Sequence, residues 1–253
     1  MPYQASLILV LAVSVTAALL QSAQSAEVKV IAANALKDGY VELVSDFEKS
    51  SGHKIVTSWT GTVNATKRVS DGEVYDLVVI GSNNIDQLIG NGKLVSGSRV
   101  DFAKSGVGIA VRAGVPRPDV STSDAIKAVV LAANSIVYSA GPSGAYVGEL
   151  LKRWGIADQI ASKVKRPSSG AEVAAILARG EADLGFAQVS EFLNVPGLID
   201  LGPLPASIQN FTIYAIGLHA AAPAPDAATA LVKHLTAPAA ALAIKNMGMQ
   251  PAR

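Results

Sequence analysis

The chain of 253 residues carries 21 Lys and Arg against 20 Asp and Glu, so its formal net charge is only +1. Nucleic-acid binding through phosphate contacts and adhesion to an acidic membrane both need a basic surface, and this charge balance argues against both. Cysteine is absent, which excludes disulfides, thiolate metal ligands and a cysteine nucleophile. Half of the residues are hydrophobic, which suits a well-buried α/β core.

The N-terminal segment is predicted to be a secretory signal peptide over residues 1–25, which implies a periplasmic protein. An apolar run over residues 5–20 is shorter than the roughly 20 residues that span a bilayer. Small residues follow it, as a cleavage site requires, although no Lys or Arg precedes it. Cleavage after Ser25 and cleavage after Ala26 both remain open, and a retained N-terminal anchor is the alternative.

Beyond the leader, strands and helices alternate, which is typical of parallel sheets. Residues 28–33 predict a short apolar strand. Apolar residues at helical spacing over 36–47, with Gly52 just beyond, predict the first helix. The next predicted elements are a strand over 54–59, a helix from Thr62 or Asn64 to Val69, a buried strand over 76–80 and a helix around 85–89.

A second series of elements starts with a strand over residues 107–111 and a stiff, proline-containing connector over 114–119. The elements predicted after it are a helix over 124–133, a strand over 135–139, helices over 142–154 and 168–177, strands over 182–188 and 209–218, and helices over 226–236 and 239–247. Residues 72–79 and 180–186 resemble each other. Common loop chemistry explains that likeness as well as two similar lobes do.

We predict an α/β fold of two lobes, each a mostly parallel sheet flanked by helices, with a ligand cleft between them. Lobe I comprises residues 26–108 and 216–253, and lobe II comprises residues 109–215. The strand over 209–218 would return the chain to lobe I, on which the last two helices should pack.

Four turns share a pattern of small or hydroxyl residues between a predicted strand and the start of a helix. They are residues 34–35, 60–62, 142–144 and 168–170. Free N–H groups and the helix dipole bind oxyanions at such places without a countercharge, and hydroxyls add donors. In open α/β sheets these turns lie at the carboxyl ends of strands, where ligands bind. Any one turn is an ordinary N-cap. Four of them in a two-lobed chain favour an anion site, with the many helix caps that any α/β protein needs as the alternative.

Other residues give weaker signals. His53, His219 and His234 have no carboxylate or second histidine at ligand spacing, so neither a metal site nor a cofactor is predicted. The sequence has no nucleophile elbow, phosphate loop or dinucleotide fingerprint. The basic candidates for a cleft, each with a surface position as the alternative, are Lys37, Lys67, Arg68, Arg112 and Arg166.

At these turns the chain resembles the molybdate-binding, type II periplasmic solute-binding proteins, over nearly all of its length after the leader. The matching stretches are residues 31–38, 71–77, 142–151, 155–158 and 179–186. The resemblance implies two α/β lobes joined by two crossover strands, and an oxyanion held by amides and hydroxyls without counterions. It also implies the membrane permease of an ABC importer as a partner, no nucleic-acid partner and a monomer.

Carried over by position, the resemblance implies a set of ligand-binding residues: Asn34, Ala35, Gly61, Thr62, Ser143, Gly144, Gly170 and Gln188. Ala35 stands where the well-known molybdate binders have Ser, and Gln188 stands where they have Tyr. Ser143 adds a hydroxyl where Ala is usual. These departures leave the ligand open between a molybdate-like oxyanion and a small carboxylate.

An enzyme on the same scaffold is the alternative function, because periplasmic aconitate isomerase is similar to this family. Its reaction needs a base that moves a proton and positive groups that hold a tricarboxylate. Lys37, Arg166 or a histidine would have to enter the cleft for that purpose. We therefore expect a binding protein rather than an enzyme.

Overall fold

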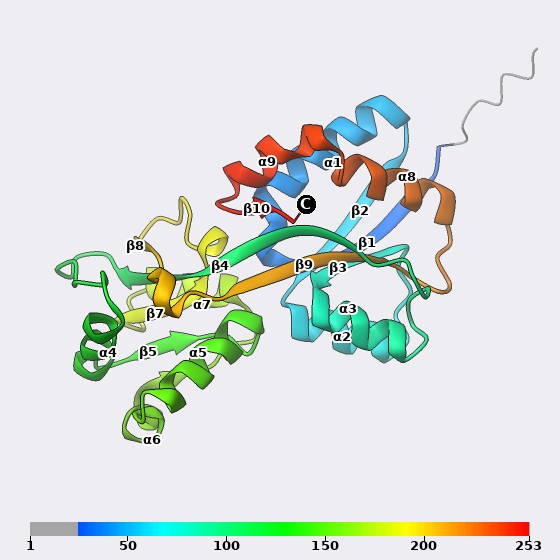
Figure 1. Ribbon diagram of the computed structural model, residues 1–253. Helices are drawn as coiled ribbons and strands as arrows, with labels where there is room; N and C mark the ends of the chain where they lie inside the picture. Colours follow the sequence, from blue (N-terminus) through cyan, green and yellow to red (C-terminus); the bar gives the residue numbers. More distant parts are fainter. Residues whose placement is uncertain (1–24, 253) are drawn as a thin grey trace, which may run out of the picture.

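The computed structural model describes residues 25–252, so nearly all of the predicted signal peptide lies outside the described residues (Figure 1). Its strands are β1 (Glu27–Ala33), β2 (Lys54–Thr60), β3 (Leu77–Gly81), β4 (Val100–Arg112), β5 (Ile136–Tyr138), β6 (Val164–Lys165), β7 (Leu184–Gln188), β8 (Leu198–Pro203), β9 (Phe211–Leu218) and β10 (Gln250–Pro251). Its helices are α1 (Lys37–Ser51), α2 (Thr62–Ser70), α3 (Ser82–Gly90), α4 (Ser123–Ala132), α5 (Pro142–Arg153), α6 (Ala157–Ile160), α7 (Gly170–Ala178), α8 (Pro225–Leu235) and α9 (Ala241–Asn246). The predicted α/β class is confirmed.

The first half of the molecule is built on the strand order β2-β1-β3-β9-β4. β1 pairs in parallel with β2 and β3, whereas β9 is antiparallel to β3 and β4. Helices α1, α8 and α9 cover one face of this sheet, and α2 and α3 cover the other (Figure 1). Leu231 and Ile244, from the last two helices, share one hydrophobic core with Val30 and Leu77.

Strand β4 connects the two halves because it changes partners along its length. Residues 100–106 pair with β9, residues 107–111 pair with β7, and residues 108–112 pair on the other side with β8. The hydrogen-bonded path is therefore continuous through β4. The sequence predicted only the second part of this strand, because Lys104, Ser105 and Gly106 interrupt its apolar pattern.

The second half continues in the order β4-β7-β5-β6, with β8 paired to β4 and helices α4 to α7 around the sheet (Figure 1). Ile109, Ile136 and Phe186 belong to its core. Strands β6, β8 and β10 were not predicted, since they are short or only half-buried and show no clear apolar period. The predicted lobe limits, 108/109 and 215/216, fall inside β4 and β9, and this division of the chain stays a prediction.

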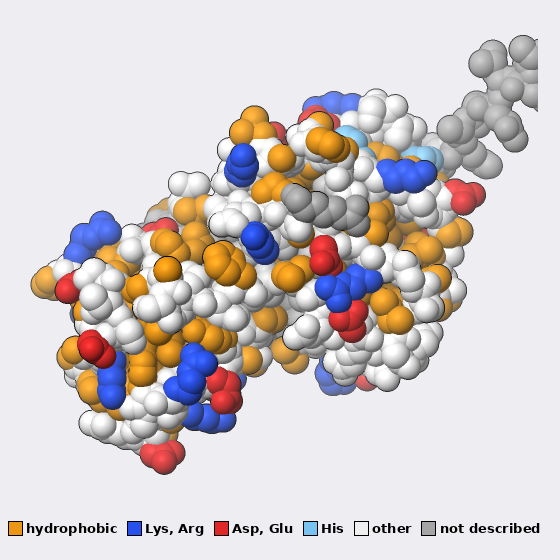
Figure 2. Space-filling model, viewed as in Figure 1, with side chains coloured by type: hydrophobic (Ala, Val, Ile, Leu, Met, Phe, Trp, Pro, Cys, Tyr) orange, Lys and Arg blue, Asp and Glu red, His pale blue; other side chains and the backbone are white. Residues whose placement is uncertain are grey.

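The surface carries no large region of one charge on the face seen in Figure 2, where Lys and Arg side chains lie among Asp and Glu. Within residues 25–252, no single helix has the length and hydropathy needed to cross a membrane. The bent pair of segments Pro225–Leu235 and Pro238–Asn246, at 58°, passes that test of length and composition together.

Candidate functional site: a small cavity between the two halves

A small cavity lies where the two halves meet, and its volume is about 20 Å³. Seven of the eight predicted ligand-binding residues line it. The complete lining is Ala33, Asn34, Ala35, Gly61, Thr62, Ser139, Gly141, Pro142, Ser143, Ser168, Ser169, Gly170, Gln188, Glu191 and Tyr214. The structure thus brings all four predicted turns to one place, although the binding role of these residues stays a prediction.

On the first half, helix α2 presents an N-terminus without a side-chain cap. Its N-cap is Gly61, and the buried Thr62 follows at the first helical position. The Thr62 hydroxyl lies 3.5 Å from the Gly81 N–H, at the outer limit of a hydrogen bond. A Cβ atom on Gly61 would approach the Ser168 carbonyl oxygen to 2.6 Å, so only glycine allows the halves to close here.

On the second half, helix α5 begins in a similarly open way. Its N-cap is Gly141, which has no side chain to offer, and Pro142 at the first position has no N–H. Ser143 is buried directly behind them and lines the cavity. Gly144 does not line the cavity: a Cβ there would lie 1.7 Å from the Ser139 carbonyl oxygen, so this glycine permits the tight turn between β5 and α5.

Helix α7 differs, because the protein itself supplies acceptors to its first turn. The Ser169 hydroxyl accepts a hydrogen bond from the Glu172 N–H at 3.2 Å. The carboxylate of Glu191, in the short 3₁₀ helix Val189–Glu191 after β7, accepts from the N–H groups of Gln188 (3.2 Å) and Ala171. A Cβ on Gly170 would lie 1.7 Å from Glu191 Oε2, which shows how closely this carboxylate covers the helix end.

Glu191 is the acidic side chain in the lining, and the residue is partly buried. Burial raises its pKa to about 7, although the two N–H donors act in the opposite direction. The neighbouring Tyr214 is fully buried, and burial together with the charge of Glu191 holds its pKa well above the usual value. No Lys or Arg stands among the residues that line the cavity.

Gln188 lines the cavity, but its side-chain amide is engaged with the two strands that connect the halves. In the orientation that satisfies every neighbour, its nitrogen donates to the Ser105 carbonyl at 3.1 Å and its oxygen accepts from the Thr212 hydroxyl at 2.8 Å. Ser105 belongs to β4 and Thr212 to β9. The amide predicted to hold a ligand therefore joins the crossover strands in this structure.

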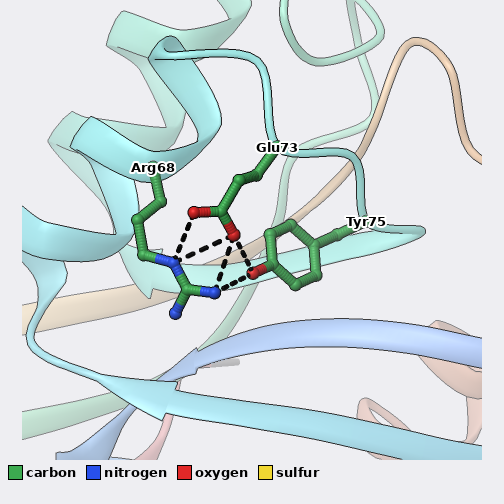
Figure 3. Close-up of polar contacts among 3 residues, drawn as sticks. All are labelled: Arg68, Glu73 and Tyr75. Carbon is green, nitrogen blue, oxygen red and sulfur yellow. Dashed lines mark hydrogen bonds and ion pairs between the residues drawn. The ribbon is translucent and has the colours of Figure 1, made fainter.

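The five basic candidates do not line the cavity. Lys67 pairs with Asp71 at 2.5 Å, and Arg112 pairs with Asp183 at 3.0 Å. Arg68 pairs with Glu73 and donates to Tyr75 at the far end of α2 (Figure 3). Arg166 lies over the Tyr138 ring at 5.2 Å. Within the described part of the chain, no group of three or more His, Asp or Glu side chains is placed to hold a metal ion.

An open groove of about 460 Å³ adjoins the cavity and shares Gly141 and Pro142 with it. It extends over residues 81–84 at the start of α3 and residues 210–213 at the start of β9. Its polar side chains include Ser82, Asn83 and Asn210, and no Lys or Arg lines it. A ligand too large for the cavity would have to reach into this groove.

The profile of the family described as bacterial extracellular solute-binding protein matches residues 28–250. The chain belongs to this family. An aconitate isomerase of a Pseudomonas species is 34% identical over 215 residues, which cover 83% of this chain and 82% of that protein. The molybdate-binding protein ModA of Azotobacter vinelandii is 29% identical over 177 residues, covering 67% of this chain and 68% of that protein.

A solved structure of the periplasmic molybdate-binding protein of Azotobacter vinelandii superposes with a TM-score of 0.75. It covers 88% of this chain and 98% of that chain at 20% identity. The likeness confirms the predicted fold, a two-lobed solute-binding protein of the type that includes molybdate binders. Members of this bacterial family are extracellular binding proteins, and the identity of the solute is a separate question.

Sequence reasoning missed Glu191 and Tyr214. A local signal for Glu191 was present, because Gln188 and Glu191 stand three residues apart, as the partners of a capping box do. The structure shows one half of that box, in which the Glu191 carboxylate accepts from the Gln188 N–H. No local signal marks Tyr214. It reaches the cavity only because β9 returns between the halves.

Proposed function

We propose that this family member captures a small anion in the small cavity between its halves and delivers it to the membrane permease of an ABC importer. In this proposal the protein is exported to the periplasm by its signal peptide and works as a monomer. The observation that carries it is the lining: two uncapped helix N-termini and the hydroxyls of Thr62 and Ser143 converge from both halves. Such donors suit an oxyanion.

The size and charge of the cavity favour a compact ligand. The 20 Å³ is the space open to the centres of water-sized atoms, and a sphere of that volume has a radius of about 1.7 Å. This radius is close to the distance of the oxygen nuclei from the centre of one tetrahedral oxyanion. Burying several carboxylates without a cation would be costly, and no Lys or Arg lines the cavity. We therefore favour a molybdate-like oxyanion or a small carboxylate over a tricarboxylate.

The test is a thermal-shift screen followed by calorimetry with molybdate, tungstate, sulfate, phosphate and small carboxylates. Bound ligand well above its dissociation constant should raise the unfolding temperature through mass action. Thr62→Val and Ser143→Ala should each weaken binding about tenfold or more, since a lost hydrogen bond to a charged group costs about 1.5–3 kcal/mol.

The matched control is Thr66→Val, which removes a buried hydroxyl of the same helix that does not line the cavity. This variant should keep the affinity of the unmodified protein. If Thr62→Val and Ser143→Ala bind like the control, the site lies elsewhere. If no anion of the panel binds, the proposal is wrong.

An isomerase is the second candidate, and two observations favour it. The relative that is 34% identical is an aconitate isomerase, and Glu191 offers a partly buried carboxyl group that can exchange a proton in the cavity. A tricarboxylate would have to extend into the adjoining groove. Conversion of trans-aconitate by the purified protein, followed by absorbance, supports this candidate. A stable, unchanged ligand supports the binding protein.

A further inference from the structure

We propose that Glu191 and the bound anion share one proton. A fully ionised oxyanion would then enter with uptake of a proton from solvent, whereas an anion that still carries a proton would enter without uptake. This inference rests on the anion site proposed above and names the residue that selects among ligands there.

The position of Glu191 carries the argument. Its carboxylate lines the same cavity as Thr62 and Ser143, so an anion held by their hydroxyls would have the carboxylate as a neighbour. It accepts from two backbone N–H groups, of Gln188 and Ala171, which leaves acceptor capacity on a carboxylate. Two ionised groups side by side in one small cavity repel each other, while a proton between them turns the contact into a strong hydrogen bond.

Charges on the elements around Glu191 do not offset it, because they are engaged elsewhere or exposed. The segment Asn34–Leu36 and strand β7, which flank it, contain no charged residue. On the other neighbouring elements, three pairs of charged side chains form ion pairs: Asp101 with Arg99, Arg112 with Asp183, and Arg179 with Glu181. The Lys104 ammonium lies over the Phe211 ring, the Glu172 carboxylate accepts from Ser168, and Lys245 is exposed. Tyr214, whose pKa is raised, stays neutral.

The proton balance differs between two oxyanions of similar shape. Sulfate has no proton to offer near neutral pH, so Glu191 must be protonated and donate its O–H to a sulfate oxygen. Hydrogenphosphate brings its own O–H, which can donate to the ionised carboxylate. In the sulfate case one O–H bond forms on Glu191 with a proton taken from solvent, and in the phosphate case no proton is gained or lost. Since burial already raises the pKa of Glu191 to about 7, one proton is available at modest cost.

The experiment is calorimetry of the mature protein with sulfate and with phosphate at pH 8.5, in two buffers that differ in ionisation enthalpy. Sulfate should take up close to one proton per site, and phosphate close to none. The dissociation constant for sulfate should rise about tenfold for each pH unit above 7, because the protonated fraction of Glu191 falls in that proportion. Equal, near-zero uptake for both anions would overturn the proposal.

Glu191→Gln supplies a second test, since its amide keeps the shape and can donate without a proton from solvent. Sulfate binding should become independent of pH and at least tenfold tighter at pH 8.5. Glu172→Gln is the control, because it neutralises an exposed carboxylate of α7 that does not line the cavity, and it should leave proton uptake unchanged.

The outcomes separate the two proposals. Sulfate binding that is insensitive to pH, in the parent protein and in Glu191→Gln alike, would leave Glu191 as a helix cap only and would keep the anion site. If neither sulfate nor phosphate binds even at pH 6, the anion site is rejected for both anions, and this inference is rejected with it. If Glu191→Gln does not fold, the proton count on the parent protein decides.

Discussion

Helices α5 and α7 both begin at the cavity, both follow turns of serine and glycine, and both bring a glycine into close contact with another part of the chain. Their N-termini nevertheless differ. The N-cap of α5 is Gly141, and no side chain caps this helix. The first turn of α7 is capped twice, by the hydroxyl of Ser169 and by the carboxylate of Glu191.

This difference shows when a helix N-terminus is available to a ligand. The dipole and the orphan N–H groups are present in every helix, but an anion benefits from them only where the chain has not already provided an acceptor. Helix α5 keeps that place open. Helix α7 already holds an internal carboxylate there, whose charge depends on pH. The following predictions test that contrast.

The largest expected effect is that of Gly144→Ala in α5. Its Cβ would lie 1.7 Å from the backbone oxygen of Ser139, which cannot move without opening the turn. We expect a loss of about 3 kcal/mol or more in the free energy of unfolding, measured with urea, because overpacking against backbone exceeds the usual side-chain case. Gly148→Ala, in the same helix with open space around it, should be stabilising by about 0.5–1 kcal/mol. Equal stability of the two variants would contradict the tight turn.

The second prediction concerns the pH dependence that Glu191 gives to α7. Its pKa is about 7 in the folded protein and about 4.5 otherwise. The folded state thus holds a proton that the unfolded chain releases between these values, and stability falls as the pH rises from 4.5 to 7. Compared with Glu191→Gln, the parent protein should lose about 3 kcal/mol across this window and nothing more above it. Urea unfolding at pH 4.5, 6 and 7.5 measures the difference. A difference that does not change with pH would mean that Glu191 is ionised throughout.

The third prediction compares the glycines of the two helices. Gly170→Ala should cost about 2 kcal/mol, less than Gly144→Ala, because the atom in the way belongs to the side chain of Glu191 rather than to backbone. In a Glu191→Ala background the same substitution should cost clearly less, which a double-mutant cycle by urea unfolding measures. If the cost is the same in both backgrounds, the carboxylate does not cover the end of α7.

These contrasts also show how far the sequence can predict the structure. The alternation of elements predicted the α/β class, and the four turns predicted one shared site, because both signals are local. Gln188, which lies in none of these turns, was predicted only from the resemblance to the family. The full length of β4 was missed, since its pairing with β9 comes from the fold and not from its own apolar pattern. The closed end of α7 was missed for the same reason: its cap, Glu191, lies 21 residues after Gly170. Likewise, pairing with β4 and β9, not the identity of Gln188, decides where its amide points.

The smallest expected effect is that of a substitution at Glu73, which lies just beyond the C-terminal end of α2, away from the cavity. It can be compared with Glu191 because the pKa values of the two carboxylates are shifted in opposite directions. Hydrogen bonds from Arg68 and then Tyr75 lower the pKa of Glu73 to about 2 (Figure 3). Because it is exposed, solvent and salt screen the pairing, and Glu73→Gln should change the unfolding temperature at pH 7 no more than the exposed control Glu149→Gln does. The sign of its pH dependence is opposite to that of Glu191: the stabilisation is present above pH 4.5 and is lost as the pH falls towards 2. Thermal unfolding at pH 7, 4 and 2.5 tests this. A large fall in the unfolding temperature of Glu73→Gln at pH 7 would show that the contacts of Arg68, Glu73 and Tyr75 stabilise α2. A change in its affinity for sulfate would show that these contacts also position Thr62.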